Sequence, residues 1–293
     1  MTACVNPKGM SYTYLVDQNV RKQQYIAALA FYLQRTSFPI VFCENTLCDF
    51  SNLFENYINA NRLEYITFDG NNFDKSRGKG YGEIEILEYA FNNSYLLKNA
   101  DSVVKITGRL QCTNINLLVK MNRLMAYPVI QANYISGNSK MMDSKIVIAP
   151  VVFFMNDLIS RKKILNDSVG VFFEHILFLS VCEQKKYKFI PFVMIPDING
   201  QSGSTGVIYN CERNCVEKLS YSYYSLINAL RLNEKYLTMK YSCIFSGFLL
   251  IICFFIKLLL CFVSLPRRFF LLSFLALLRN WKKIFINVIC SLL

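Results

Sequence analysis

The alternation of short apolar runs with amphipathic segments over the first 110 residues constrains the fold of this chain more than any other feature. Strands are predicted at Ser11–Val16, Ile40–Cys43, Leu63–Phe68 and Ser102–Val104. Helices are predicted at Asn19–Gln34, at Leu47–Asn59 and from Gly82 onward. Strands that alternate with helices in this way are typical of an α/β fold with a mainly parallel sheet, whose ligands bind at the carboxyl ends of the strands.

Polar side chains follow three of these strands at the point where each strand ends. They are Glu44 and Asn45 after the second strand, Asp69 after the third, and Lys105, Thr107 and Arg109 around the end of the fourth. The carboxyl ends of parallel strands lie at one edge of the sheet, so we expect these side chains to border one crevice. The two cations among them favour an anionic ligand.

A glycine-rich basic segment from Arg77 to Glu83 leads into the third predicted helix. Gly78 and Gly80 free the backbone to approach a ligand closely, and Arg77 and Lys79 add positive charge. This arrangement predicts a phosphate site, because unpaired N–H groups and the helix dipole favour negative charge at a helix N-terminus. The spacing matches neither a Walker loop nor the dinucleotide-binding fingerprint. A solvated surface turn is the alternative interpretation of the same residues.

The alternation continues in the second part of the chain. Further strands are predicted at Val129–Tyr134, Ile146–Val152 and Phe189–Met194, and further helices at Ile115–Met125, Met155–Leu165, Val171–Cys182 and Cys215–Met239. Glu174 lies among apolar neighbours, so its carboxylate needs a partner or a catalytic role unless it faces water. The lone histidine, His175, is expected to pack or to cap its helix. The loop 196–206 either covers a ligand or is a flexible connection.

The C-terminal segment, residues 241–293, differs in character from residues 1–240, and we expect two parts with this boundary. Cys243–Leu265 is apolar except for Lys257, and at about 1.5 Å per residue it is long enough to cross a bilayer. The pieces Phe269–Leu278 and Ile284–Leu293 are shorter and suit helices that lie in the membrane interface. Membrane association is therefore expected, and spanning or lying flat stays open.

The formal net charge is +12, and half of this excess lies in the C-terminal segment, which contains no acidic residue after Cys243. This distribution indicates an anionic membrane surface rather than nucleic acid, since no compact basic and aromatic platform occurs elsewhere. The eleven cysteines are scattered, and the start of the chain lacks the apolar core of a signal peptide. We therefore expect free thiols in a reducing cytosol. A single histidine gives little support to a zinc site.

The motifs GKGYGE at residues 78–83 and KITGR at residues 105–109 resemble those of bacterial glycosyltransferases that build capsular polysaccharide or lipopolysaccharide. Glu44-Asn45 and Gly200–Gly206 are further matches, and the resemblance covers about residues 10–210. It implies a fold of the nucleotide-diphospho-sugar transferase type (GT-A), with a mixed, mostly parallel sheet flanked by helices. The C-terminal membrane-associated helices would follow this domain.

The resemblance also implies a nucleotide-sugar donor above the strand ends. The residues that would hold the nucleotide and its diphosphate are Glu44, Asn45, Asp69, Arg77, Gly78, Lys79, Gly80, Glu83 and Thr107. Lys105 and Arg109 would face the sugar or the leaving group, where fixed cations stabilise a departing nucleoside diphosphate.

Most members of this fold hold a divalent metal, Mg²⁺ or Mn²⁺, with an Asp-x-Asp motif where this chain has Thr107-Gly108-Arg109. Either cationic side chains replace the metal, or another acid such as Asp143 contributes to a metal site. An inverting enzyme would need a base, for which Glu174 is our first candidate, ahead of Asp197 and Glu83. A retaining enzyme would not need that base, so the stereochemistry stays open.

We therefore expect a glycosyltransferase that moves a sugar from a nucleotide sugar to a lipid-linked or surface polysaccharide acceptor. Its catalytic domain would lie in the cytoplasm, at the inner membrane. The expected partners are the nucleotide sugar, the lipid-linked glycan and the membrane, and not nucleic acid. The alternative is a non-catalytic, membrane-anchored protein that binds a nucleotide or another anion without turnover.

Overall fold

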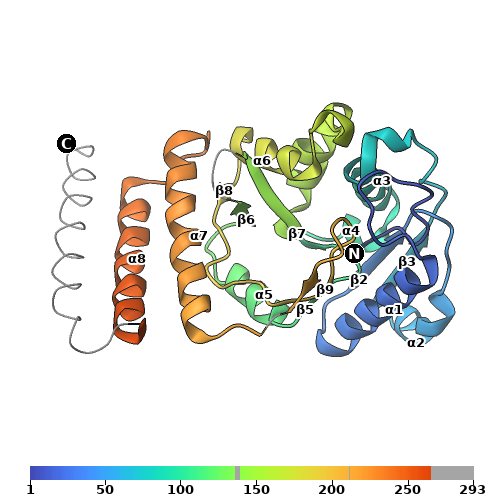
Figure 1. The fold of residues 1–293 in the computed structure, drawn as a ribbon, viewed down its shortest axis with the longest axis horizontal. Coiled ribbons are helices and arrows are strands. Elements are labelled where there is room, and N and C mark those ends of the chain that lie inside the picture. Colours follow the sequence, from blue (N-terminus) through green and yellow to red (C-terminus); the bar gives the residue numbers. More distant parts are fainter. Residues whose placement is uncertain (136–138, 211, 265–293) are drawn as a thin grey trace.

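The computed structural model describes residues 1–135, 139–210 and 212–264. A mixed sheet with helices on both faces forms its centre (Figure 1). The segment β1 (Thr2–Ala3) pairs in parallel with β2 (Ile40–Glu44), and β2 pairs in parallel with β3 (Leu63–Thr67). This part of the sheet is the parallel arrangement that the sequence predicts.

The second part of the sheet is mixed. Its strands, in spatial order, are β4 (Ser102–Ile106), β7 (Met141–Pro150), β6 (Val129–Ile135) and β8 (Lys188–Phe189). β7 runs antiparallel to both of its neighbours, while β6 and β8 are parallel. A parallel bridge between Thr2, the first residue of β1, and Thr107, directly after β4, joins the two sets of strands, so that the spatial order becomes β3-β2-β1-β4-β7-β6-β8. The predicted α/β fold is confirmed, with one long antiparallel strand in its middle.

This strand order creates a topological switch point between β1 and β4. From β1 the chain passes through α1 (Gln18–Arg35) to β2, and then through a short 3₁₀ helix and α2 (Glu55–Asn59) to β3. It then returns through α3 (Gly78–Asn93) and α4 (Tyr95–Lys98) to β4, on the other side of β1. In open α/β sheets, ligands bind in the crevice at the carboxyl ends of the strands beside such a reversal.

Two hydrophobic clusters cover the two faces of the sheet. Alternate residues of β7 contribute to each cluster, with Val147 and Ala149 in one and Ile146 and Ile148 in the other. Side chains alternate between the faces of a strand, so a strand with both faces covered reads as one continuous apolar run. α1 and α5 (Ile115–Arg123) cover one face; α3, α6 (Phe173–Glu183) and α7 (Cys215–Lys235) cover the other.

Several expected elements differ in the structure. Ser11–Val16 is a loop with exposed Tyr12 and Tyr14, because its alternating pattern has no neighbouring strand to pair with. Met155–Leu165 falls on a π-helix (Phe153–Leu158) followed by a 3₁₀ helix (Ile159–Ile164). The expected strand at 189–194 is limited to β8, and the loop 196–206 contains β9 (Ile198–Gln201), which forms a hairpin with β10 (Ile208–Tyr209). β9 also pairs with β5 (Gln111–Cys112).

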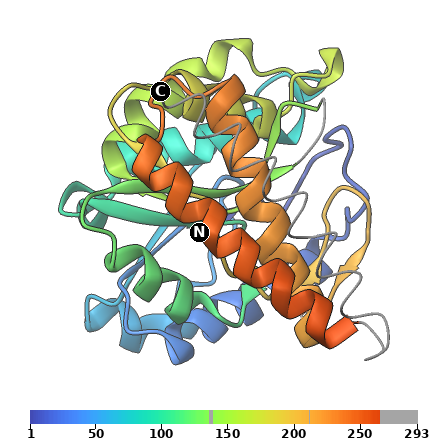
Figure 2. The ribbon, with the colours of Figure 1, turned by 90° about the vertical axis from the view of Figure 1, so that its left-hand side faces the viewer.

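The described part of the C-terminal segment is the helix α8 (Cys243–Ser264), which lies beside α7 (Figure 2). Its side chains Leu249, Leu250 and Cys253 are buried and belong to the same core cluster as α3 and α6. Within the residues that the structure describes, none of the helices combines the length and the apolarity that a membrane span requires. The predicted interfacial pieces Phe269–Leu278 and Ile284–Leu293 lie outside the described residues.

Candidate functional site

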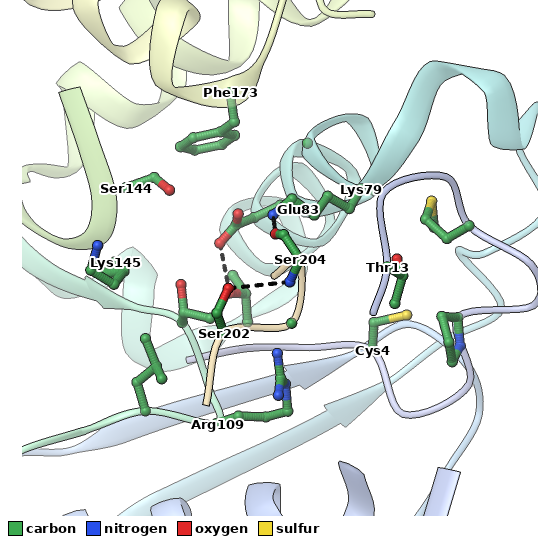
Figure 3. A pocket seen from close by; sticks show the side chains of 18 of the residues that line it. Cys4, Thr13, Lys79, Glu83, Arg109, Ser144, Lys145, Phe173, Ser202 and Ser204 are labelled. Carbon is green, nitrogen blue, oxygen red and sulfur yellow. Dashed lines mark hydrogen bonds between the residues drawn. The ribbon is translucent and has the colours of Figure 1, made fainter. Parts of the chain in front are cut away.

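A cavity of about 370 Å³ lies at the carboxyl ends of β1 and β4, at the switch point of the sheet. Residues from the start of α3, the start of α6 and the middle of β7 line its other sides. The β9–β10 hairpin covers it with the loop Ser202–Thr205, and the loop after β1 closes the remaining side. In Figure 3, Arg109, Lys79 and Lys145 reach this space from three different segments. The cavity is in the size range of small-molecule sites.

Arg109 follows β4 and is 7% exposed. Its Nη1 donates to Oε1 of Gln24 at 2.8 Å and to the carbonyl of Gln201 at 3.4 Å, while its buried Nε has no hydrogen-bond partner within residues 1–135, 139–210 and 212–264. Burial lowers the pKa of Arg109, and the neighbouring Arg21 lowers it further. A buried guanidinium with donors to spare is costly unless an anion binds it.

A second buried guanidinium, that of Arg21 in the first turn of α1, lies on the same side of the cavity. Most of its donors bind the carbonyls of Cys4, Val5 and Leu15, which fixes the loop after β1. Within the described part of the chain, neither Arg21 nor Arg109 forms an ion pair with a carboxylate. The sequence analysis missed Arg21, because nothing in the local pattern of α1 distinguishes it from a surface arginine.

Gly203 in the hairpin loop leaves space for the guanidinium group of Arg109 and lies beside that of Arg21. A Cβ at this position would lie 2.2 Å from Nη2 of Arg109 and 3.8 Å from Nη1 of Arg21. The backbone carbonyl of Gly203 also accepts the N–H of Tyr14 at 2.9 Å, which ties the hairpin to the loop after β1. The loop rich in small residues therefore covers the cavity, as one of the two sequence interpretations predicts.

Two lysines complete the positive charge of the site. Lys79, in the first turn of α3, donates to the hydroxyl of Ser204 in the hairpin loop. Lys145 forms an ion pair with Asp143 at 2.6 Å on β7. Burial acts to lower the pKa of Lys145, but Asp143 outweighs it and the net shift is upward. Among the residues that the structure describes, Arg109 and Lys79 thus form no ion pair with a carboxylate, whereas Lys145 is paired with Asp143.

Asn45 provides neutral hydrogen-bonding capacity at the end of β2. Its side chain is fully buried and lines the cavity, yet in the described part of the chain neither Oδ1 nor Nδ2 has a hydrogen-bond partner. An unsatisfied buried amide destabilises a fold by about 1–3 kcal/mol for each group left unpaired. A ligand that offers both a donor and an acceptor would satisfy it.

The helix α3 begins at Gly78, four residues earlier than the sequence predicts, so the glycines belong to its first turns. A Cβ on Gly78 would lie 2.2 Å from Oδ2 of Asp167, and one on Gly80 would lie 3.0 Å from Oδ1. The N–H of Gly80 donates to Oδ2 of Asp167 at 3.3 Å. The predicted anion site at this helix terminus is therefore filled by a carboxylate of the chain itself, one that the sequence analysis did not single out.

Lys105 and Glu83 form an ion pair of 2.5 Å beside the cavity. Lys105 is 2% exposed and also donates to the carbonyl of Ser144 at 2.6 Å, so it lies behind Glu83 and does not line the cavity. Glu83 lines the cavity and accepts the hydroxyl of Thr2 at 3.1 Å. Lys105 thus fixes Glu83 in place. The contact expected between Lys105 and the sugar or leaving group would require the ion pair of Lys105 and Glu83 to separate.

Glu174 lines the cavity from the first turn of α6. Its Oε1 accepts the hydroxyl of Ser144 on β7 at 2.7 Å, which orients the carboxylate. The neighbouring His175 points back to the helix start, where its Nδ1 accepts the N–H of Phe172 at 3.1 Å. The capping role expected of His175 is confirmed, and Glu174 is in a position to contact a ligand.

The structure thus separates the predicted site residues into two sets. Those that line the cavity are Asn45, Lys79, Gly80, Glu83, Thr107, Arg109, Asp143 and Glu174. Those that do not are Glu44, Asp69, Arg77, Gly78 and Lys105. The members of the first set come from five different segments, which only the tertiary fold brings together.

The residues outside the cavity have structural contacts. Glu44 is fully buried and accepts hydrogen bonds from backbone N–H groups of three loop residues and from two threonine hydroxyls. Arg77 donates to three carbonyls of the segment 162–165, and its guanidinium lies 3.8 Å from the ring centre of Tyr81. The exposed Asp69 accepts the amide of Asn72 at 2.5 Å. These contacts tie loops to the sheet and to α3.

The described residues do not fit a divalent metal site. In the described part of the chain, no three side chains of His, Cys, Asp or Glu lie close enough together to hold a metal ion. Asp143, the expected ligand, is already in an ion pair with Lys145. We therefore derive no step through a metal.

No family model matches this chain, and a search of curated proteins finds no match either. Among solved structures, the chain is similar to one titled "Crystal structure of HddC from Yersinia pseudotuberculosis", with 10% sequence identity and a TM-score of 0.34. The superposition covers 68% of this chain and 92% of that chain. A TM-score this low does not establish a common fold, so the resemblance to glycosyltransferases stays a prediction and function must be inferred from the cavity.

Proposed function

We propose that this protein is a glycosyltransferase that binds a nucleotide-diphospho-sugar in the cavity at the switch point. One observation carries the proposal: two buried guanidinium groups, of Arg109 and Arg21, share one side of the cavity without a carboxylate partner among the described residues. A diphosphate supplies the missing negative charge, and arginine binds phosphate oxygens with two parallel hydrogen bonds.

The remaining polar groups suit the other parts of such a ligand. Asn45 at the end of β2 has an unpaired donor and an unpaired acceptor, which match the edge of a nucleobase or the hydroxyls of a ribose. Lys79 is close enough to the hairpin to bind Ser204, and it adds a further positive charge for the diphosphate. Carboxylates on the opposite wall, at α6 and β7, suit the hydroxyls of a sugar and of an acceptor.

The proposed reaction forms a bond between an acceptor oxygen and the anomeric carbon of the sugar. The bond from that carbon to the diphosphate oxygen breaks, and its electron pair stays on the departing nucleoside diphosphate. Arg109 and Lys79 stabilise the charge that develops there, because fixed charges in a cavity with little water need no reorganisation. Glu174, oriented by Ser144, takes the proton of the acceptor hydroxyl. The acceptor we expect is a lipid-linked or surface glycan.

The test is a binding and turnover screen with UDP-glucose, UDP-galactose, UDP-N-acetylglucosamine, GDP-mannose and dTDP-glucose. Titration calorimetry measures binding, and a coupled assay measures the release of nucleoside diphosphate with and without added Mg²⁺. Arg109→Gln should weaken the binding of the active donor by about ten- to a hundredfold, since a hydrogen bond to a charged group contributes about 1.5–3 kcal/mol.

Arg231→Gln is the matched control, because Arg231 is exposed on α7 and does not line the cavity. It should bind the donor as the wild type does. Equal binding by the wild type and Arg109→Gln would refute the assignment of the diphosphate to Arg109. Tight binding of a nucleotide sugar without turnover, even when glycan acceptors are added, would instead favour the non-catalytic binding protein.

A further inference from the structure

Asp167 is a buried carboxylate at the edge of the cavity that the proposed reaction does not use. It opens a short 3₁₀ helix (Asp167–Val169) and is 1% exposed, between the start of α3 and the start of α6. Gly78 and Gly80 lack side chains at the points where α3 passes it, and a Cβ on either would collide with or press on the carboxylate. The close packing of these three residues fixes the position of the Asp167 side chain.

The hydrogen bonds of this carboxylate are incomplete. Oδ2 accepts the N–H of Gly80 at 3.3 Å, whereas the buried Oδ1 has no hydrogen-bond partner among the described residues, and Asp167 lines the cavity. A carboxylate oxygen accepts hydrogen bonds and donates none when it is ionised. Leaving it unpaired in a buried place destabilises the folded protein, so a donor from a bound molecule would be favourable.

The chemistry of the surroundings limits which donor can bind here. A phosphate is unsuitable as the partner of Oδ1, because an ionised phosphate oxygen has no hydrogen to donate and its charge would repel the carboxylates of Asp167 and the nearby Glu174, even though Lys79 also lies near Asp167. The half-buried ring of Phe172 and the buried ring of Phe173 also line this part of the cavity and provide apolar surface. A neutral group with an apolar ring and hydroxyl donors fits both features, and a sugar is such a group.

We propose that Oδ1 of Asp167 accepts a hydrogen bond from a hydroxyl of the donor sugar and so positions the sugar between α3 and α6. This proposal rests on the proposed function, because it assigns one part of the same ligand. It makes Asp167 a residue that selects the sugar, while Arg109 binds the diphosphate that all such donors share.

The test compares two ligands and two proteins. Asp167→Asn keeps the shape of the side chain and an oxygen for the N–H of Gly80, but it turns an N–H₂ toward the cavity in place of Oδ1. The variant should bind the active nucleotide sugar at least about tenfold more weakly and should bind the matching nucleoside diphosphate, UDP for a UDP-sugar, with unchanged affinity. Asp157→Asn is the control, since Asp157 is half-buried on the π-helix and outside the cavity.

A second measurement uses monodeoxy analogues of the active donor and does not depend on the variant. One analogue, which lacks the hydroxyl that Asp167 binds, should bind the wild type about as weakly as the complete donor binds Asp167→Asn. The affinity of this analogue should be the same for the wild type and for Asp167→Asn. Equal losses of nucleotide-sugar and nucleoside-diphosphate binding in Asp167→Asn would show a purely structural role and overturn the proposal. It is also overturned if every monodeoxy analogue binds the wild type like the complete donor.

These outcomes are distinct from a failure of the proposed function. If the wild type binds none of the five nucleotide sugars, both proposals are refuted together. If the wild type binds a donor and Asp167→Asn binds it equally well, only the assignment of Asp167 is refuted.

Discussion

The buried carboxylate of Asp167 predicts an unusual dependence of stability on pH. Burial raises the pKa of Asp167 to about 6 from the ordinary value of 3.8; the N–H of Gly80 and the charge of Lys79 oppose this shift, and Glu174 adds to it. Between these two pH values the folded protein holds a proton that the unfolded chain has released. Stability therefore falls as pH rises through this range, because ionisation is easier in the unfolded chain.

The magnitude follows from the size of the shift. A shift of roughly two pKa units corresponds to about 3 kcal/mol, at about 1.4 kcal/mol per unit. Asp167→Asn has no proton to lose at this position and keeps nearly the same shape. The free energy of unfolding of the wild type, relative to that of Asp167→Asn, should therefore decrease by about 3 kcal/mol between about pH 3 and about pH 8.

Urea denaturation of both proteins, followed by circular dichroism across this pH range, measures the difference. The other carboxylates titrate in both proteins, so subtraction removes their contribution as long as they are distant from residue 167. The slope of the unfolding free energy with urea must be equal in the two proteins for the comparison to hold. A difference in unfolding free energy between the two proteins that stays constant with pH would refute the reasoning. A difference that shifts in favour of the wild type as pH rises would refute it as well, because that result requires a lowered pKa of Asp167.

Three further predictions concern the cavity. Gly203→Ala should displace Arg109, since the new Cβ would lie 2.2 Å from its Nη2. Calorimetry should then show weaker nucleotide-sugar binding, and an unchanged affinity would contradict the packing argument. Lys105→Met should lower the free energy of unfolding by about 3 kcal/mol, because it leaves the carboxylate of Glu83 without its ion pair. Thermal denaturation tests this, and a smaller loss in the double variant Lys105→Met/Glu83→Gln is expected. Glu174→Gln should reduce turnover by about a hundredfold or more with donor affinity unchanged, and a variant as active as the wild type would exclude Glu174 as the base.

The prediction for Lys105 shows where a sequence motif is ambiguous. The KITGR segment places a lysine and an arginine four residues apart at a strand end, and both are expected to face a ligand. In the structure Arg109 borders the cavity, while Lys105 lies beneath Glu83 with 2% exposure. Both side chains are cationic and lie at the same edge of the sheet. Only the ion pair that Lys105 forms with Glu83 in the folded chain distinguishes it from Arg109, which borders the cavity.

The glycine-rich segment gives a second example. Glycines before a helix are compatible with a phosphate loop and with close packing against another part of the chain. Here Gly78 and Gly80 approach Asp167, 87 residues away from Gly80 along the sequence. Arg77 turns to the carbonyls of the segment 162–165 instead of the cavity. The segment therefore contributes Lys79, Gly80 and Glu83 to the cavity lining, while the close packing of Gly78 and Gly80 against Asp167 gives its glycines a structural reason that the local spacing does not show.

The sequence by itself determined the α/β class, the positions of most helices and strands, and the edge of the sheet at which the cavity lies. Hydrophobic periodicity carries this information, because each element must bury one face against its neighbours. Only the tertiary structure decided which charged groups are left unpaired there. Arg21 and Arg109 border the same cavity, and Asp167 accepts the N–H of Gly80, because the fold brings together distant segments that no local pattern relates. The chemistry of a cavity depends on those contacts, because a charge already paired within the chain is not free for a ligand.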